Sequence, residues 1–450
     1  MERDKLDFGN ERINKLFSAL FLPTLAGMVF NCLLNICDGM FVGHGVGSDA
    51  LAAINIVAPL FLICTGIGLM FGIGASVIGS IRLAEGNVKA ARIIMTQAYL
   101  AGAVVFGVII AGSALYTDRV LNLFGCSPAL LGLATDYLLW LLPGLVFFYL
   151  QCAGMMLIRL DGSPKYAMSV QIVAAVLNIF LDWLMVYPLD MGIRGASIAT
   201  SLCCILGGLM VVAYFLVFSD KLKFYRLKAS VKSLMLSLRN TWYMVRIGFA
   251  TLVAELAMGV MMVTGNYMFM SDLGEDGVAA FSVSCYLFPI IFSISNAVAQ
   301  ASQPIISFNY GAKNPARVQQ ALRIALVTAL GCGVLITCAM WFGAPLLASL
   351  FLPSDVPAYS LALEGLPLVG TCAIFFALNI TFIGYYQSTE RNVKSTLFML
   401  LRGIVFLVPG FIFLPEIAGT VGLWLAIPAA EALTLLVITI QYMTRQLKKQ

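Results

Sequence analysis

Long apolar runs, separated by short polar or Gly/Pro turns, divide the chain into twelve segments. Each run is long enough for a helix to cross a hydrocarbon core, which takes about 20 residues. The runs are continuous rather than alternating residue by residue, so they predict helices and not the strands of a β-barrel. The expected spans are 13–41, 51–80, 92–115, 130–158, 166–188, 195–218, 243–270, 280–306, 320–344, 360–386, 396–415 and 419–443.

Composition supports an integral membrane protein and excludes several other classes. Of the 450 residues, 61% are hydrophobic and only 11% charged, against about 25% charged in soluble domains. The net charge of +5 is no nucleic-acid signature, and the charged N-terminus argues against a cleavable signal peptide. Eleven cysteines without a C-x-x-C pair, together with the single histidine His44, predict neither a disulfide framework nor a metal cluster. No nucleotide-binding loop, zinc-protease motif or nucleophile elbow is present, so nothing indicates an enzyme or a cofactor.

The placement of Lys and Arg predicts the topology. If the N-terminus is cytoplasmic, 25 of the 27 basic residues fall in cytoplasmic segments, with Arg402 counted among them, and only Arg119 and Arg194 lie outside. This is a strong positive-inside bias. We therefore expect a multi-pass membrane protein with both termini in the cytoplasm.

The chain also repeats itself at a separation of 227 residues. Matching positions are Asp49 and Asp276, Ser80 and Ser307, Asn87 and Asn314, and Leu123-Phe124 and Leu350-Phe351. A repeat of six spans keeps its orientation, which predicts two six-helix bundles related by an axis along the membrane normal. The expected division is a first lobe over 1–220, a basic cytoplasmic linker over 221–242 and a second lobe over 243–450.

Two acidic residues of the first half stand out because they lie within apolar helices. Asp38 shares a helical stripe with Asn31 and Asn35, and Asp182 lies one turn after Asn178. A carboxylate inside a membrane costs roughly 2.5–3.5 kcal/mol on insertion scales, which suggests a role as an ion or proton site. The alternatives are that Asp38 is solvated at the interface and that Asn178 makes a packing hydrogen bond.

No Lys or Arg is expected deep in the first six helices, so Asp38 and Asp182 must bind a mobile cation, take protons or face water. With the oxygen of Asn178 they offer the hard-oxygen ligands that an alkali cation prefers. Thr200, deep in the sixth helix, can add a hydroxyl group.

The second half carries a methionine-rich helical face and further polar residues. Glu255, Met258, Met262 and Asn266 share one side of the seventh helix, which suits varied apolar ligands but also suits plain packing. Gln300 belongs to a polar stripe of the eighth helix that lines a cavity or joins helices. Glu364 and Glu431 are expected to be solvated near helix ends. Gly68 and Gly72 are expected to allow close helix packing.

Four stretches together resemble the MATE family of multidrug and toxic compound extrusion transporters. They are CDGMFVGHGVGSDALAAINIVAP (37–59), NIFLD (178–182), GIRGASIAT (192–200) and ASQPIISFNYGAKNPARV (301–318). The resemblance implies an all-α integral membrane fold with twelve transmembrane helices in two pseudo-symmetric six-helix bundles, and antiport driven by sodium or protons. In its DinF-like and MepA-like branches the first-lobe cation site corresponds to Asp38, Asn178, Asp182 and Thr200. In the NorM-like branch the first acidic residue of the second lobe corresponds to Glu255.

The leading interpretation is therefore a secondary antiporter that exports amphipathic, often cationic, drugs and other organic compounds, with Na⁺ or H⁺ as coupling ion. If sodium is the ion, Asp38, Asn178 and Asp182 are its ligands. The candidate lining of the substrate cavity comprises Asn31, Asn35, Met258, Met262, Asn266 and Gln300. Expected partners are small-molecule substrates and membrane lipid, without nucleic acid, and a monomer is expected. The alternatives are a flippase for a lipid-linked precursor and a non-transporting receptor or channel.

Overall fold

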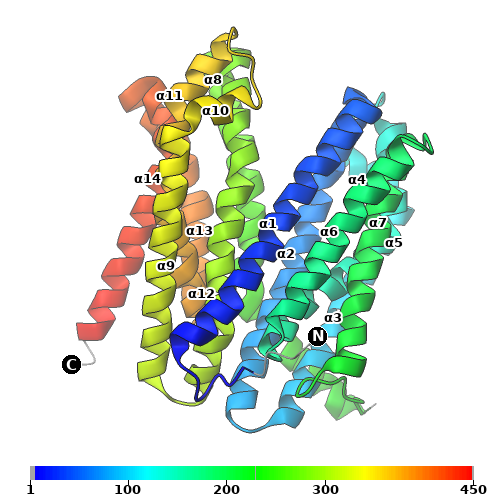
Figure 1. The fold of residues 1–450 in the computed structure, drawn as a ribbon, viewed down its shortest axis with the longest axis vertical. Helices are drawn as coiled ribbons and strands as arrows, with labels where there is room; N and C mark the ends of the chain where they lie inside the picture. Colours follow the sequence, from blue (N-terminus) through cyan, green and yellow to red (C-terminus); the bar gives the residue numbers. More distant parts are fainter. Residues whose placement is uncertain (1–5, 229, 448–450) are drawn as a thin grey trace. The chain divides into compact units, whose positions relative to one another are not determined.

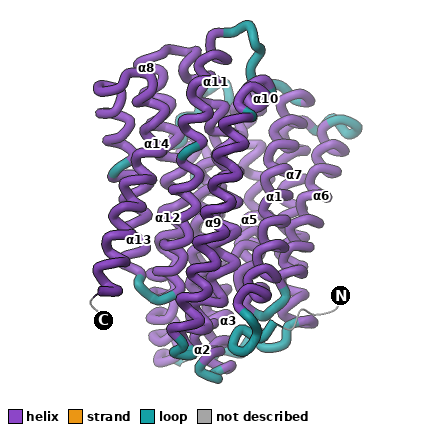
Figure 2. The backbone as a smooth tube through the Cα atoms, turned by 60° about the vertical axis from the view of Figure 1, so that its left-hand side comes forward, coloured by secondary structure: helices purple, strands orange, loops and turns teal. Residues whose placement is uncertain are grey.

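All regular structure is helical in the part of the chain that the structure describes (Figure 2). The computed structural model describes residues 6–228 and 230–447, without the side chains at 33, 35–37, 39, 40, 43, 44, 48, 51 and 445–447. The α-helices are α1 (Ile13–Gly45), α2 (Ser48–Ala84), α3 (Val88–Leu115), α4 (Thr117–Leu123), α5 (Leu131–Leu160), α6 (Pro164–Val186), α7 (Gly192–Ala213), α8 (Val231–Gly311), α9 (Pro315–Phe342), α10 (Ala344–Ser349), α11 (Pro357–Gly370), α12 (Cys372–Ser388), α13 (Asn392–Leu400) and α14 (Leu407–Leu447). Two π-helical turns, η1 (Tyr214–Phe218) and η2 (Leu401–Val405), extend α7 and α13.

The count of twelve spans is confirmed once two breaks are taken into account. Ten helical stretches of the described residues are long and apolar enough to cross a membrane. Two of them, in α8 and α14, contain one non-helical residue each: Gly274, with φ 66°, and Gly419, with φ 58°. Because a positive φ suits glycine and interrupts a right-handed helix, each stretch is two spans joined by a tight turn.

The 227-residue repeat is also present in the backbone. Positive φ angles occur at Gly47 and Gly274, at Gly86 and Lys313, and at Gly192 and Gly419. The two members of each pair are separated by the same 227 residues that separate the repeated sequence positions. The same turns therefore follow the same helices in both halves, as the predicted pair of six-helix bundles requires.

Contacts divide the chain into two compact units, the first comprising residues up to 252 together with 307–315, and the second comprising 253–306 and the residues from 316 onward. In the first unit, α5 packs against α2 and α7, and α6 packs against α1 and α7 (Figure 1). In the second unit, α14 packs against α11 and α12. A Cβ atom at Gly72 would lie 2.9 Å from the Ala153 Cα atom, so the close packing predicted for this glycine is confirmed.

The helix predicted to begin at 243 begins earlier, at Val231. Its first turn is capped by Ser230, whose hydroxyl accepts a hydrogen bond from the Ser233 amide at 3.2 Å. The sequence pattern placed this stretch in the linker because its charges lower its hydropathy. The second half of the predicted linker is thus the amphipathic beginning of α8.

Candidate ion and substrate site

The carboxyl groups of Asp38 and Asp182 lie within hydrogen-bonding reach of each other in the first unit. Asp38 comes from α1 and Asp182 from α6, and these two helices pack together. Asp182 is 0% exposed, and Asp38 is half-buried. The structure therefore brings together the two acidic residues that the sequence singled out, although 144 positions separate them in the chain.

These carboxylates lack the partners that buried charges usually have. Oδ1 of Asp38 and both carboxylate oxygens of Asp182 are buried without a hydrogen-bond partner among the described residues. None of the ion pairs within the described part of the chain involves either residue. A buried charge without a partner is costly, so the pair is suited to receive a proton or a metal cation.

Neutral polar groups surround the acidic pair. Asn178 is buried one turn before Asp182 on α6, and its side chain contacts the Cys203 thiol of α7. The Thr200 hydroxyl donates to the Ala196 carbonyl at 3.1 Å and also contacts the Tyr137 hydroxyl. Tyr137 lies close enough to both carboxylates for their charges to act on it. The predicted residues Asn178 and Thr200 thus lie close to the acidic pair.

Two neighbours of this site were not predicted from the sequence. Cys203 follows Thr200 by three residues on α7, so its position on the same helical face was a usable signal. Tyr137 is one of many aromatic residues in α5, and nothing in its sequence surroundings distinguishes it. No group of three or more His, Cys, Asp or Glu side chains with metal-site geometry occurs in the described ranges. A metal cation here would therefore also need neutral oxygens, such as those of Asn178, Thr200 and water.

The remaining first-lobe candidates are less informative. Asn31 is exposed on α1. The side chain of Asn35 lies outside the described residues.

Arg159 is buried in the last turn of α5, with Nη1 3.6 Å from the Met156 sulfur. Arg159 lies at the end of the helix, where its side chain folds against α5, so the expectation of no Lys or Arg deep in the first six helices is not contradicted.

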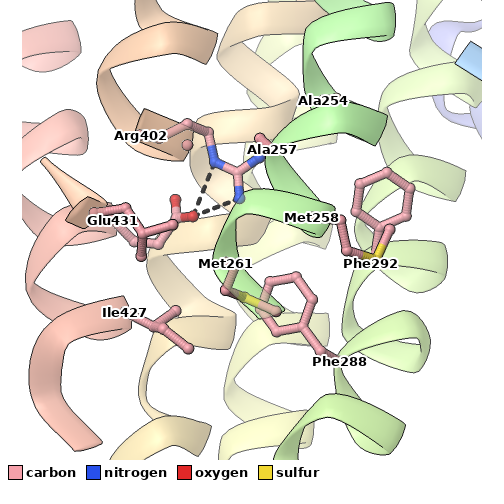
Figure 3. Close-up of a pocket in the computed structure, with 11 residues that line it drawn as sticks. Ala254, Ala257, Met258, Met261, Phe288, Phe292, Arg402, Ile427 and Glu431 are labelled. Atoms are coloured by element: carbon pink, nitrogen blue, oxygen red, sulfur yellow. Dashed lines mark hydrogen bonds and ion pairs between the residues drawn. The ribbon is translucent and has the colours of Figure 1, made fainter. Parts of the chain in front are cut away.

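The second unit contains a small pocket beside a buried ion pair (Figure 3). Arg402 of η2 donates through Nε to Glu431 Oε1 of α14 at 2.8 Å, and Nη2 bonds to the same oxygen. The guanidinium carbon lies 4.1 Å from the centre of the Phe376 ring. Asn379 donates to Glu431 Oε2 at 2.8 Å. Arg402 and Glu431 are 6% and 2% exposed.

This ion pair corrects two predictions. Arg402 was counted among the cytoplasmic basic residues, and Glu431 was expected to be solvated, but both are buried in a helical stretch that can span the membrane. Their mutual pairing explains how charge is tolerated there, since buried charges are kept when they are paired and hydrogen-bonded. The expectation was right for Glu364, which is exposed.

The predicted second-lobe residues fall into different environments. Met258 lines the pocket together with Met261, Phe288 and Phe292 (Figure 3), but Met262 does not. Asn266 is exposed, and Gln300 is buried. The room left in the pocket is about 20 Å³, enough for roughly one water molecule. The helical face predicted from the sequence is therefore split between the pocket and other surroundings.

Glu255 is buried in α8, one turn before Met258. No ion pair within the described part of the chain includes it. In this respect Glu255 resembles the acidic pair of the first unit and differs from Glu431.

A comparison with known protein families identifies the family of this chain. The model of the MatE family matches residues 23–184 and 250–418. The chain belongs to the MatE family. The two matched regions include Asp38, Asp182, Glu255 and Arg402 but end before Glu431.

Relatives of this MatE protein match over nearly their whole length. The multidrug export protein MepA of Staphylococcus saprophyticus is 23% identical over 431 residues, which cover 94% of this chain and 92% of the relative. A FAD transporter of Shewanella oneidensis is 25% identical, with the same coverage. Among solved structures, an outward-facing multidrug resistance MATE family transporter of the MOP superfamily superposes with a TM-score of 0.91 at 21% identity, over 100% of both chains. The fold expected from the resemblance is confirmed.

Proposed function

We propose that this chain is a secondary antiporter that exports amphipathic, often cationic, organic compounds in exchange for Na⁺ or H⁺. The observation that carries the proposal is the contact between Asp38 and Asp182, whose buried oxygens lack a fixed positive partner among the described residues. The MepA relatives are named multidrug export proteins, which supports organic drugs as the exported compounds.

The acidic pair would act as the coupling site. Two adjacent carboxylates in an apolar bundle repel each other unless a positive charge lies between them. An ion that enters from one side of the membrane relieves this repulsion, and its release to the other side restores it. Loading therefore changes the relative free energy of the two access states, which is the condition for coupling. Each charge that moves inward gains about 2.3 kcal/mol per 100 mV.

The charge of the described sites favours cationic over anionic cargo. One relative is named a FAD transporter, and a flippase for a lipid-linked precursor would also handle phosphates. Such anionic groups call for an uncompensated positive charge, whereas Arg402 is occupied by Glu431. Among the described residues of the second lobe, Glu255 is the buried acidic residue without an ion pair, and it remains available for an ion or a cationic substrate.

The membrane location, the orientation of the termini and the oligomeric state are inferred from charge and family. We place both termini on the cytoplasmic side of a bacterial plasma membrane because basic residues gather in the corresponding segments. We further infer a monomer that needs no cofactor besides its coupling ion and that acts as a transporter rather than an enzyme, a receptor or a channel.

Transport in proteoliposomes tests the proposal. We expect an ethidium-like dye to move against its gradient when either a Na⁺ gradient or a pH gradient is imposed, and the effective gradient identifies the ion. The Asp182→Asn variant should lose this movement, whereas Asp49→Asn, a matched change of an exposed acidic residue, should keep it. Dye movement without any imposed gradient, or undiminished movement in Asp182→Asn, contradicts the proposal.

A further inference from the structure

The linker and the beginning of α8 form a strongly basic surface, here called the linker surface (residues 219–246). Seven basic residues occur in it, and all seven are exposed: Lys221, Lys223, Arg226, Lys228, Lys232, Arg239 and Arg246. Asp220 is its only acidic residue. The linker surface therefore carries a net charge of +6, which exceeds the +5 of the whole chain.

An apolar stripe runs along the same surface. Four of its side chains, Leu234, Met235, Leu238 and Trp242, are between 61% and 67% exposed, and Val231 is 77% exposed. At 100° per residue these five positions fall within about 100° of the helix circumference. Lys232, Arg239 and Arg246 follow along one edge of the stripe. An apolar stripe with tryptophan and flanking Lys/Arg is the composition of a helix that lies in a membrane interface.

Hydrogen bonds on the opposite side fix the direction in which the stripe points. Asn240 donates to the Gln97 side-chain oxygen of α3 at 2.9 Å, and Gln97 donates to the Ser237 hydroxyl at 2.8 Å. The preceding linker is held by Asp161, whose carboxylate accepts from the amides of Lys221 at 3.0 Å and Leu222 at 2.9 Å. The stripe is thus an oriented outer face of the first unit and not a loosely attached segment.

Helix length places this stripe beyond the hydrocarbon core. From Val231 to the turn at Gly274, α8 is helical without a break, and this length is roughly twice the ~20 residues that a span needs. Lys232, Arg239 and Arg246 lie in the first part, and three charges there favour its location outside the core. An exposed apolar stripe outside the core is then left at the level of the lipid headgroups.

We propose that the linker surface binds the anionic phospholipid headgroups of one membrane leaflet, with the stripe from Val231 to Trp242 inserted at the boundary between headgroups and acyl chains. Charge complementarity carries the choice of an anionic leaflet: basic residues near such a surface each contribute about 1 kcal/mol of attraction. Binding would hold this part of the first unit at the membrane surface, independently of which compound is transported.

The test is a titration of the detergent-purified full chain with phosphatidylglycerol or phosphatidylcholine, followed by the thermal unfolding midpoint. At low salt, phosphatidylglycerol should raise the midpoint at a concentration at least about tenfold lower than phosphatidylcholine, and high salt should reduce this preference. The triple variant Lys228→Gln/Lys232→Gln/Arg239→Gln should lose most of the preference. The matched control Arg12→Gln/Lys15→Gln/Arg323→Gln removes the same charge elsewhere and should keep it.

Two further measurements distinguish lipid binding from other causes of a shift in the unfolding midpoint. Shallow spin-labelled lipids in vesicles should quench Trp242 fluorescence, taken as the difference between the natural chain and Trp242→Phe, more strongly than deep-labelled lipids. Inorganic phosphate at an equal concentration of charge should not reproduce the effect of phosphatidylglycerol. Equal affinity for both lipids, equal loss in the control triple variant, an effect of phosphate alone, or an unquenched Trp242 would each overturn the proposal.

Discussion

The acidic pair of the first unit and Glu431 of the second unit are stabilised in opposite ways. In the first unit, Asp38 and Asp182 face each other, and three of their four oxygens are buried without a hydrogen bond among the described residues. In the second unit, Glu431 is bonded to Arg402 and Asn379. Burial alone therefore does not identify an ion site. A carboxylate with a permanent cation is part of the structure, and a carboxylate without one has to take its positive charge from solution.

The largest effect is expected from breaking the first-unit pair. In proteoliposomes, Asp182→Asn and Asp38→Asn should each abolish ion-driven export, because the coupling charge is lost. A driving energy of about 2.3 kcal/mol per charge at 100 mV corresponds to roughly a 50-fold concentration gradient, and dye accumulation should fall by up to that factor. Protein yield and the unfolding midpoint should stay close to those of the natural chain, because the substitution relieves the repulsion between the carboxylates. A variant that unfolds instead would mean that the pair is structural.

The second-largest effect should be a loss of stability and not a loss of ion coupling. Glu431→Gln removes the charge that compensates Arg402, and breaking a buried ion pair from one side typically costs about 3–5 kcal/mol. The unfolding midpoint should drop clearly, and the double variant Arg402→Met/Glu431→Gln should recover much of it. Glu364→Gln, at an exposed position, is the control. An unchanged midpoint for Glu431→Gln together with lost ion dependence would reverse the assignment of the two units.

An intermediate effect is expected at Glu255, which is buried like Glu431 but has no ion pair in the described ranges. If it adds a second ion or substrate contact, Glu255→Gln should lower the rate of dye export severalfold without the stability loss of Glu431→Gln. Rate and unfolding midpoint measured on the same preparation separate these cases. A large destabilisation would place Glu255 with the structural charges.

The smallest effect should come from a neutral neighbour. Tyr137→Phe removes the hydroxyl group that contacts Thr200 beside the acidic pair. Loss of one hydrogen bond of this kind is worth about 1 kcal/mol. The concentration of coupling ion that gives half-maximal transport should therefore shift by roughly fivefold, with the maximal rate retained. Tyr99→Phe, another buried tyrosine of the first unit, is the control.

Features that repeat along the chain, and single residues that are unusual for their surroundings, could be predicted from the sequence. Twelve spans follow from apolar runs, and the duplication follows from one common separation, which the turns at Gly47 and Gly274 repeat in the backbone. Asp38 and Asp182 could be named because a carboxylate in an apolar run is unusual. Hydropathy could not place Val231 at the start of α8, because amphipathic helices average to low hydropathy.

Features that depend on contacts between distant segments were missed. Arg402 follows Arg391 and Lys394 in the chain and therefore looked cytoplasmic, but its pairing with Glu431 brings together η2 and α14. Glu431 could not be recognised as buried without that partner. Tyr137 and the anchoring of the linker by Asp161 likewise require the packing of α5 against α7 and the return of the chain after η1. A pattern along one helix does not contain this information.

The most direct measurement is the amount of coupling ion bound by the purified protein. Sodium binding and proton uptake can be measured on the natural chain, on Asp38→Asn/Asp182→Asn and on Arg402→Met/Glu431→Gln. We expect the natural chain and the Arg402→Met/Glu431→Gln variant to bind the ion equally, and the Asp38→Asn/Asp182→Asn variant to lose one bound cation per chain. Undiminished binding by the Asp38/Asp182 variant would contradict it.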